Sequence, residues 1–281
     1  MTTKTIAITG ATGHFGAIAL NLLKAKNANV IALVRSPAKI SGVEARQFDY
    51  AKPKGQVEAL QGVDTLILVS SSEVGQRIQQ HKNVIEAAKK AGVKHIIYTS
   101  LLGATNDNTV KSLAGEHVAT EAALKASGIT YTILRNGWYT ENYTASIPAA
   151  LANNAFYGSA KNGKISSVLR AELAEAAVNV ALGEGHENQT YELAGSTSWT
   201  LADLAAEISK QTGKEIPYVD IPAEDYAAAL VQAGLDAGFA GLIAQWDVDA
   251  SNAALFSEDK TLEKLLGRPT EGLDVAVKQA L

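Results

Sequence analysis

Residues 9–16 read Thr9-Gly10-Ala11-Thr12-Gly13-His14-Phe15-Gly16, directly after the apolar run 5–8 and before a stretch of helical periodicity over 17–26. Glycines in a strand-to-helix turn permit a tight bend and a close approach of the backbone to a ligand. The following helix then offers N–H groups at its amino terminus to a pyrophosphate, and Thr12 can add a hydroxyl. We interpret Gly10, Gly13 and Gly16 as a dinucleotide-binding motif. The alternative is a glycine-rich turn without a ligand.

Short apolar runs alternate with helical patterns through the first half of the chain. Near-continuous apolar runs indicate strands that are buried on both faces, as in parallel sheets. The runs lie at 5–8, 30–34, 65–69, 95–98 and 131–134. Helical patterns lie between them, and the one over 84–91 stops at Gly92, a frequent helix terminator. This order predicts an α/β fold with a doubly wound parallel Rossmann sheet, whose ligand crevice lies at the carboxyl ends of the strands.

The rhythm changes after about residue 135 to mixed helix and loop. We therefore predict an NADP-binding Rossmann domain over 1–137 and a smaller, mainly substrate-binding C-terminal α/β lobe over 138–281, with 189–195 returning to the sheet as a strand. A capping-box pattern at Thr200 and Asp203 predicts the start of a helix. Further patterns predict a small strand over 214–219 and helices over 223–245 and 259–266.

The end of the second predicted strand bears on the choice of cofactor. An NAD site normally has Asp or Glu there, to bind the ribose hydroxyls. This chain has Arg35 instead, which can pair with a 2′-phosphate through charge-assisted hydrogen bonds. We therefore predict NADPH in preference to NADH; the alternative for Arg35 is a solvated surface cation. Asp49, after the likely third strand, either accepts from the adenine amino group or caps a helix.

The composition excludes several other classes of protein. The 281 residues are 47% apolar and 19% charged with a net charge of −4, so we expect no nucleic-acid partner. The absence of cysteine excludes disulfides and thiolate catalysis. The histidines lack the ligand spacing of a metal site, so no metal is expected. The chain enters a strand without a signal segment and has no apolar run long enough for a membrane span, which favours a cytoplasmic protein. A homodimer is compatible with the sequence.

Several strings of sequence carry a resemblance to a known family. They include TGATGHFG (9–16), SSSEVGQR (70–77), HIIYTSLLGA (95–104) and RNGWYTENY (135–143). With these the chain resembles the NmrA-like atypical short-chain dehydrogenase/reductases, especially the NADPH-dependent quinone reductases among them. The glycine motif is shared by the whole superfamily, whereas the second and fourth strings are much more specific. The similarity extends nearly from end to end.

The resemblance implies roles for particular residues. It implies that Ala11, Thr12, His14 and Phe15 join the three glycines and Arg35 in binding NADPH. It places a loop beside the nicotinamide half of the cofactor, formed by Ser70, Ser71, Glu73, Gly75, Gln76 and Arg77. It also implies that Asn136 contacts the cofactor and that Trp138, Tyr139 and Asn142 border the substrate cleft. Alternatives remain: Glu73 and Arg77 can cap a helix, and Trp138, Tyr139 and Tyr143 can be core residues.

The chain departs from the wider superfamily at the catalytic pair. Members that handle alcohols use a Tyr-x-x-x-Lys pair on the helix after the fifth strand, together with a Ser at the end of that strand. Here Leu113 and His117 occupy the pair's positions, and Ser100 remains with Leu101 beside it. No phenol is left to protonate an alkoxide, whereas a reduced quinone is a weakly basic aryloxide that needs less acid assistance. His117 is the one candidate catalytic residue, and its alternative is a core or surface histidine.

These inferences predict an enzyme, an NADPH-dependent reductase of quinones or similar conjugated electrophiles, with a small-molecule acceptor as its partner. Two alternatives share the fold. One is a reductase of cationic triarylmethane dyes, and the other is a redox-sensing regulator that binds NADP(H) without turnover. The sequence alone also allows a dinucleotide-binding protein of unassigned role.

Overall fold

The computed structural model describes residues 4–281, and the chain forms two compact units. The first unit contains the chain up to Ala104 together with Leu113–Asn136 and Arg170–Leu193; the second contains Thr105–Ser112, Gly137–Leu169 and Ala194–Leu281. The sequence assigns 170–188 to the C-terminal lobe, but the structure includes this segment in the first unit. The reason is a helix over Arg170–Leu182 in which eight residues are buried, including Leu173, Ala177 and Val180.

The first unit is built on a seven-stranded sheet in the order β3-β2-β1-β4-β5-β6-β8, with every neighbouring pair parallel. Its strands are β1 (Thr5–Thr9), β2 (Asn29–Val34), β3 (Glu44–Gln47), β4 (Thr65–Leu68), β5 (His95–Leu101), β6 (Thr130–Asn136) and β8 (Gln189–Leu193). The predicted doubly wound Rossmann sheet is confirmed. The strand order reverses between β1 and β4, which is where such sheets bind ligands.

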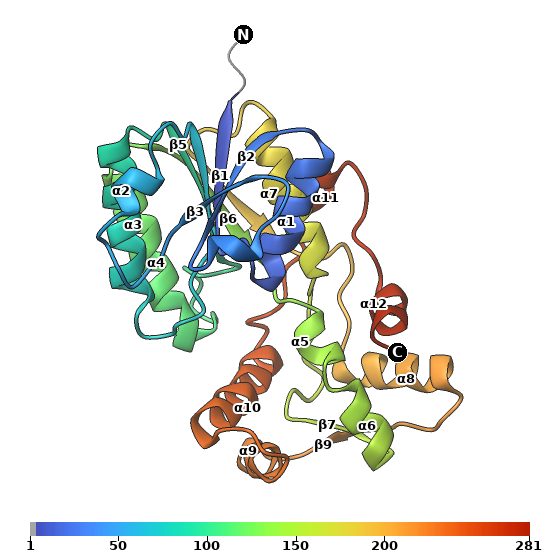
Figure 1. The fold of residues 1–281 in the computed structure, drawn as a ribbon. Coiled ribbons are helices and arrows are strands. Elements are labelled where there is room, and N and C mark those ends of the chain that lie inside the picture. Colours follow the sequence, from blue (N-terminus) through green and yellow to red (C-terminus); the bar gives the residue numbers. More distant parts are fainter. Residues whose placement is uncertain (1–3) are drawn as a thin grey trace. The chain divides into compact units, whose positions relative to one another are not determined.

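Helices cover both faces of this sheet (Figure 1). One face carries α2 (Gln56–Ala59), α3 (Arg77–Ala91) and α4 (Lys111–Ala126), and the other carries α1 (His14–Ala25) and α7 (Arg170–Leu182). A short 3₁₀ turn, Pro37–Lys39, follows β2. Helix α3 ends at Gly92 in the left-handed conformation (φ 79°), as predicted.

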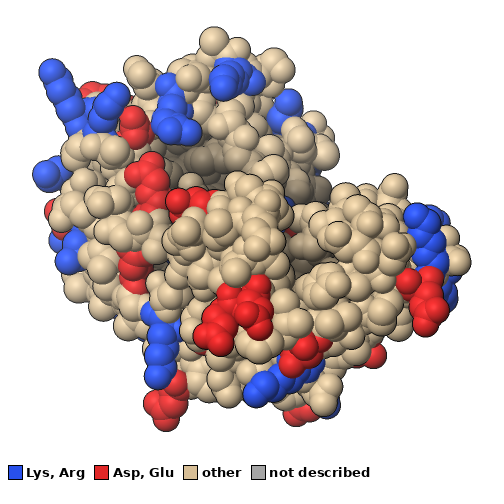
Figure 2. Space-filling view, turned by 90° about the horizontal axis from the view of Figure 1, so that it is seen from below, with Lys and Arg blue, Asp and Glu red and all other residues tan. Residues whose placement is uncertain are grey.

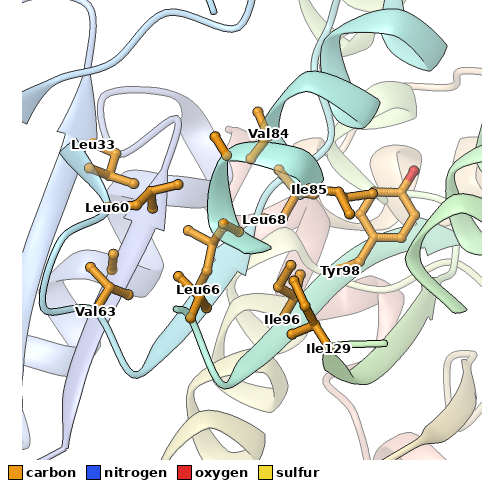
Figure 3. Packing of buried hydrophobic residues seen from close by; sticks show 14 of the residues in the cluster. Leu33, Leu60, Val63, Leu66, Leu68, Val84, Ile85, Ile96, Tyr98 and Ile129 are labelled. Carbon is orange, nitrogen blue, oxygen red and sulfur yellow. The ribbon is translucent and has the colours of Figure 1, made fainter. Parts of the chain in front are cut away.

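A buried apolar cluster fills the space between the sheet and α2, α3 and α4. It includes Leu66 and Ile96 from the strands and Val84 and Ile85 from α3. In Figure 3, Tyr98 lies at one end of this cluster and its hydroxyl oxygen points away from the aliphatic side chains. The core is therefore apolar up to this phenol, which needs a polar partner on the α4 side.

The second unit combines short strands with helices. Its strands β7 (Phe156–Gly158) and β9 (Tyr218–Asp220) pair in parallel. Its helices are α5 (Glu141–Thr144), α6 (Ile147–Asn153), α8 (Leu201–Thr212), α9 (Ala223–Gln232), α10 (Ala237–Ser251), α11 (Thr261–Leu266) and α12 (Leu273–Ala280). The capping box at Thr200 and Asp203 is present at the start of α8, as predicted.

The continuous helix predicted over 223–245 is wrong. Gly234 adopts φ 98°, a left-handed conformation that ends α9, and Asp236 then caps α10 by accepting from the backbone N–H of Phe239. The apolar periodicity continues through this break, so the pattern alone does not reveal two helices. The glycine and the capping aspartate are the local signals that separate them.

The surface carries charges of both signs. On the face in Figure 2, lysine and arginine groups lie among aspartate and glutamate groups rather than in one continuous basic area. Over residues 4–281, no helix combines the length and the apolar character that a bilayer crossing requires.

Candidate functional site

The glycine turn joins β1 to α1 at the carboxyl edge of the sheet. Gly10 has φ 61°, and its carbonyl accepts from the N–H of Gly13 at 2.8 Å. A Cβ at Gly16 would lie only 2.2 Å from the Gly10 carbonyl oxygen, so this position accepts nothing larger than glycine without a backbone shift. Helix α1 starts at His14, and among the described residues no side chain caps it. The N–H groups at its start are therefore available to an anion.

Side chains lock the backbone at the point where the strand order reverses. The Thr9 hydroxyl at the end of β1 accepts from the Val69 N–H at 2.9 Å, just beyond β4. The Tyr50 hydroxyl contacts Thr9 Oγ1 at 2.7 Å and also donates to the Val69 carbonyl. Burial raises the pKa of Tyr50, so it remains a neutral donor. Sequence reasoning missed Tyr50, although it is the residue directly after Asp49.

The predicted adenosine-side residues follow β2 and β3. Arg35 is exposed immediately after β2, so its guanidinium is accessible from solvent. Asp49 is partly buried; its Oδ1 accepts from the Ala51 N–H at 3.0 Å, and its Oδ2 lies 3.7 Å from Lys52 Nζ. The aspartate thus stabilises its own turn and does not cap a helix, because the next helix, α2, begins only at Gln56.

The predicted loop over 70–77 follows β4 and leads into α3. Its backbone N–H groups donate to side chains outside it: Ser70 to Thr99 Oγ1 at 2.8 Å, Ser71 to His81 Nε2 at 3.0 Å and Gly75 to Glu116 Oε1 at 3.0 Å. The loop is therefore held by groups on β5, α3 and α4.

The loop's own polar side chains also hold it together. Arg77 Nε donates to the Ser71 carbonyl at 2.5 Å, and its guanidinium lies 4.0 Å from Glu116. Glu73 accepts from the side chain of Gln80 at 2.7 Å, while the Gln76 N–H donates to the Glu73 carbonyl. Glu73, Gly75 and Gln76 remain exposed. Glu73 and Arg77 thus stabilise the loop before α3, but neither caps the helix, because no side chain of the described residues makes a cap hydrogen bond at its amino terminus.

A buried ionic network lies below the carboxyl ends of β5 and β6. Arg135 donates to both oxygens of Glu121, at 2.9 and 2.7 Å, and to Glu192 at 2.8 Å. Ser100 donates to the same Glu121 at 2.6 Å. The hydroxyl that matches the superfamily's catalytic serine is thus engaged with a carboxylate of α4.

Asn136 ends β6 and is 4% exposed. Within the described chain, neither its side-chain nitrogen nor its side-chain oxygen has a hydrogen-bond partner. Buried amides are almost always hydrogen-bonded, so a donor and acceptor pair left open at this edge fits a polar ligand.

His117 lies within the core of the first unit. It is 5% exposed, and its Nδ1 is 2.8 Å from the Tyr98 hydroxyl. Burial, reinforced by the charge of Arg77 and by His81, lowers the pKa of His117 to about 3. The ring is therefore neutral near pH 7. Leu113, at the other position of the superfamily's pair, is buried as well.

The predicted substrate residues all belong to the second unit. Trp138 is buried and packs edge-to-face on Trp246 with ring centroids 5.2 Å apart. Tyr139 is partly buried and forms an isolated bridge with Val168, while Asn142 is exposed on α5. Tyr143 is buried against Trp199, and no group of the described chain pairs with its hydroxyl. Trp138 and Tyr143 thus pack in the core of this unit, whereas Tyr139 and Asn142 retain exposed surface.

Over residues 4–281, no three or more His, Cys, Asp or Glu side chains lie together in a group that could hold a metal ion.

The model of the NmrA-like family matches residues 2–246. The chain belongs to the NmrA-like family. It is 52% identical over 279 residues to quinone oxidoreductase 2 of Escherichia coli strain K12, covering 97% of each chain. Its fold superposes on the NADPH-dependent quinone oxidoreductase of Escherichia coli complexed with NADPH, with a TM-score of 0.93, 50% identity, and coverage of 98% of this chain and 99% of that one.

A second enzyme of this fold is also similar. The triphenylmethane reductase of Citrobacter sp., complexed with NADP(H), matches with a TM-score of 0.94 and 36% identity over 99% of this chain and 100% of that one.

The glycine turn yields a paired test of stability. Gly16→Ala should lower the free energy of unfolding by about 1–3 kcal/mol, because the new methyl group meets backbone that cannot move aside freely. Gly115→Ala is the matched control, since Gly115 lies in helix α4 and a Cβ there meets nothing within 4 Å. It should raise stability by about 0.5–1 kcal/mol, through helix propensity. Urea unfolding measures both, and equal values would contradict the packing described here.

Proposed function

We propose that this protein catalyses the NADPH-dependent two-electron reduction of quinones or similar conjugated electrophiles. The observation that carries the proposal is the 52% identity to quinone oxidoreductase 2 over 97% of both chains. The carboxyl edge of the sheet supports it independently, because it has a free helix amino terminus, a close-packed glycine turn and an exposed arginine after β2.

The residues of the first unit fit the parts of NADPH in order. The turn formed by Gly10, Ala11, Thr12, Gly13, His14, Phe15 and Gly16 would hold the pyrophosphate. Arg35 would pair with the 2′-phosphate, and Asp49 Oδ2 would accept from the adenine amino group. The loop over 70–77 and the open amide of Asn136 would contact the nicotinamide half. The unpaired amide supports this last assignment, because a carboxamide offers one donor and one acceptor in return.

The bound cofactor would supply a hydride, and the acceptor would gain that hydride and a proton to become a hydroquinone. Helix α4 offers this reaction no phenol, since Leu113 stands at that position and is buried. The protein then needs to orient the acceptor and exclude water. Holding the acceptor close to the nicotinamide can account for much of the rate enhancement. For the acceptor we propose contacts with Tyr139 and Asn142, and with the edge of Trp138.

The first test concerns Arg35. NADPH should bind about tenfold or more tightly than NADH, a difference of about 1.4 kcal/mol, because a carboxylate is absent and a guanidinium is present. Arg35→Met should remove most of this preference while leaving NADH affinity unchanged. Lys26→Met, at the far end of α1, removes the same charge and should leave the preference intact. Calorimetry measures each dissociation constant, and equal affinities in the unaltered protein would refute the cofactor assignment.

The second test is turnover with a panel of acceptors. Benzoquinones and naphthoquinones should be reduced with a kcat/KM about tenfold or more above that of triarylmethane dyes, followed by loss of NADPH absorbance. A reaction without protein corrects for direct reduction. Faster reduction of the dyes would favour the activity named for the Citrobacter relative. Tight NADPH binding without turnover of any acceptor would favour a regulator instead.

The third test concerns His117 as a proton donor. A neutral, buried imidazole that is already hydrogen-bonded to Tyr98 can assist only weakly. We therefore expect His117→Gln to lower kcat less than about tenfold, because general acid catalysis by a well-placed group normally contributes about a hundredfold or more. Steady-state kinetics across pH, with thermal unfolding as the check on folding, decides the point. A hundredfold loss in a folded variant would establish His117 as the acid.

A further inference from the structure

His81 lies on α3, is fully buried and belongs to no function described so far. Its Nε2 is 3.0 Å from the backbone nitrogen of Ser71. A backbone N–H can only donate, so Nε2 must be the unprotonated, accepting nitrogen of the ring. The Ser71 N–H is itself shielded, because Ser71 is 6% exposed. Without His81, a donor at the exit of β4 would be buried with no partner.

The other ring nitrogen fixes this tautomer. Nδ1 carries the proton and lies 3.0 Å from the Thr120 hydroxyl on α4. Thr120 in turn donates to the Glu116 carbonyl at 2.8 Å, so its oxygen is free to accept from His81. The hydrogen bonds therefore run in one direction, from Ser71 to His81 at one end and from His81 through Thr120 to α4 at the other. This order prevents the ring from turning its N–H toward Ser71.

The surroundings keep the ring neutral and in place. Burial, together with the charge of Arg77, lowers the pKa of His81 to about 4. Tyr98 packs edge-on against one side with ring centroids 5.5 Å apart, and Tyr50 lies on another side at 6.1 Å. The ring that accepts from Ser71 is thus packed by both aromatic neighbours, one of which also binds the carbonyl of Val69.

We propose that His81 is a positioning residue that fixes the Ser71 backbone and so sets the conformation of the loop over 70–77 for the nicotinamide half of NADPH. The inference rests on the proposed function where it assigns the loop to NADPH. The anchor, which is the hydrogen bond from the Ser71 N–H to His81 Nε2, does not depend on that function. Residues 72–76 are exposed. The conformation of the loop therefore depends on the points where its backbone is hydrogen-bonded, and Ser71 is the last such point before the exposed residues.

The experiment compares His81→Leu with His81→Gln. Leucine fills similar space without an acceptor, whereas the glutamine side-chain oxygen can reach the place of Nε2. In the cofactor-free protein, His81→Leu should raise hydrogen exchange at the Ser71 amide about tenfold or more, because the buried N–H loses its acceptor. The NADPH dissociation constant should rise by a similar factor, and His81→Gln should recover most of both. Thr120→Val should give a smaller change in the same direction.

His95 provides the control. It is also buried, and its Nε2 is hydrogen-bonded to Thr132 at 2.8 Å, but it lies at the start of β5, on the opposite edge of the sheet. His95→Leu should lower thermal stability without raising Ser71 exchange or the NADPH dissociation constant.

The outcomes separate this inference from the proposed function. Unchanged hydrogen exchange at the Ser71 amide in a folded His81→Leu variant overturns the claim that His81 fixes the Ser71 backbone. Raised exchange with unchanged NADPH affinity and kcat/KM overturns the positioning role, while the reductase activity stands. If the unaltered protein neither binds NADPH nor reduces quinones, the proposed function has failed, and the exchange data still decide the anchor. Should His81→Leu not fold, the Thr120→Val variant gives the same readouts.

Discussion

The contact between Gly16 and the Gly10 carbonyl is the constraint on which the candidate cofactor site depends. It brings the first turn of α1 onto the end of β1 more closely than any side chain would permit. The uncapped amino terminus of the helix is thereby placed at the carboxyl edge, next to the reversal of strand order. The close backbone approach follows from the absence of a Cβ at Gly16, and the unpaired N–H groups follow from the missing side-chain cap; together they are the two features of a pyrophosphate site.

Further hydrogen bonds fix the loops at the same carboxyl edge of the sheet. Thr9, Tyr50 and Val69 tie the ends of β1 and β4 together, and His81 and Glu116 tie the loop after β4 to α3 and α4. Thr9, His81 and Glu116 accept from backbone N–H groups, whereas Tyr50 donates to the Val69 carbonyl, and all four side chains are buried or partly buried. The position of the exposed loop residues therefore depends on α3 and α4, because these helices hold both ends of the loop over 70–77.

The sequence predicts the parts of the molecule that depend on local periodicity and turn chemistry. The central strands, the termination at Gly92 and the capping box at Thr200 are confirmed because each is determined by a few neighbouring residues. The break at Gly234 and the membership of α7 in the first unit were not predicted. The break at Gly234 is hidden because apolar spacing continues across it. The membership of α7 depends on which surface this largely buried helix covers, and the sequence does not specify that surface.

The same limit applies to the site. The glycine turn and Arg35 can be predicted from the sequence, because the turn is a short local motif and Arg35 directly follows a predicted strand. The roles of Tyr50, His81 and Glu116 depend on contacts between residues 10–41 positions apart, from His81 with Ser71 to Glu116 with Gly75. No spacing rule connects such pairs. The sequence offers no signal for His81, whose hydrogen bond with Ser71 is visible only in the structure.

Helix α4 explains why the chemistry differs from that of alcohol-handling relatives. Leu113, His117 and Glu121 are spaced four residues apart and are all buried, so they form one inward ridge. His117 meets the Tyr98 hydroxyl, and Glu121 binds both Ser100 and Arg135. Of the two positions that elsewhere form the catalytic pair, Leu113 is apolar and buried, and His117 is hydrogen-bonded to the Tyr98 hydroxyl of β5. Because these side chains of α4 are buried in the core, the helix presents no acid to the substrate. The reaction then depends on the orientation of the acceptor and on an acceptor, such as a quinone, whose reduced form stabilises negative charge.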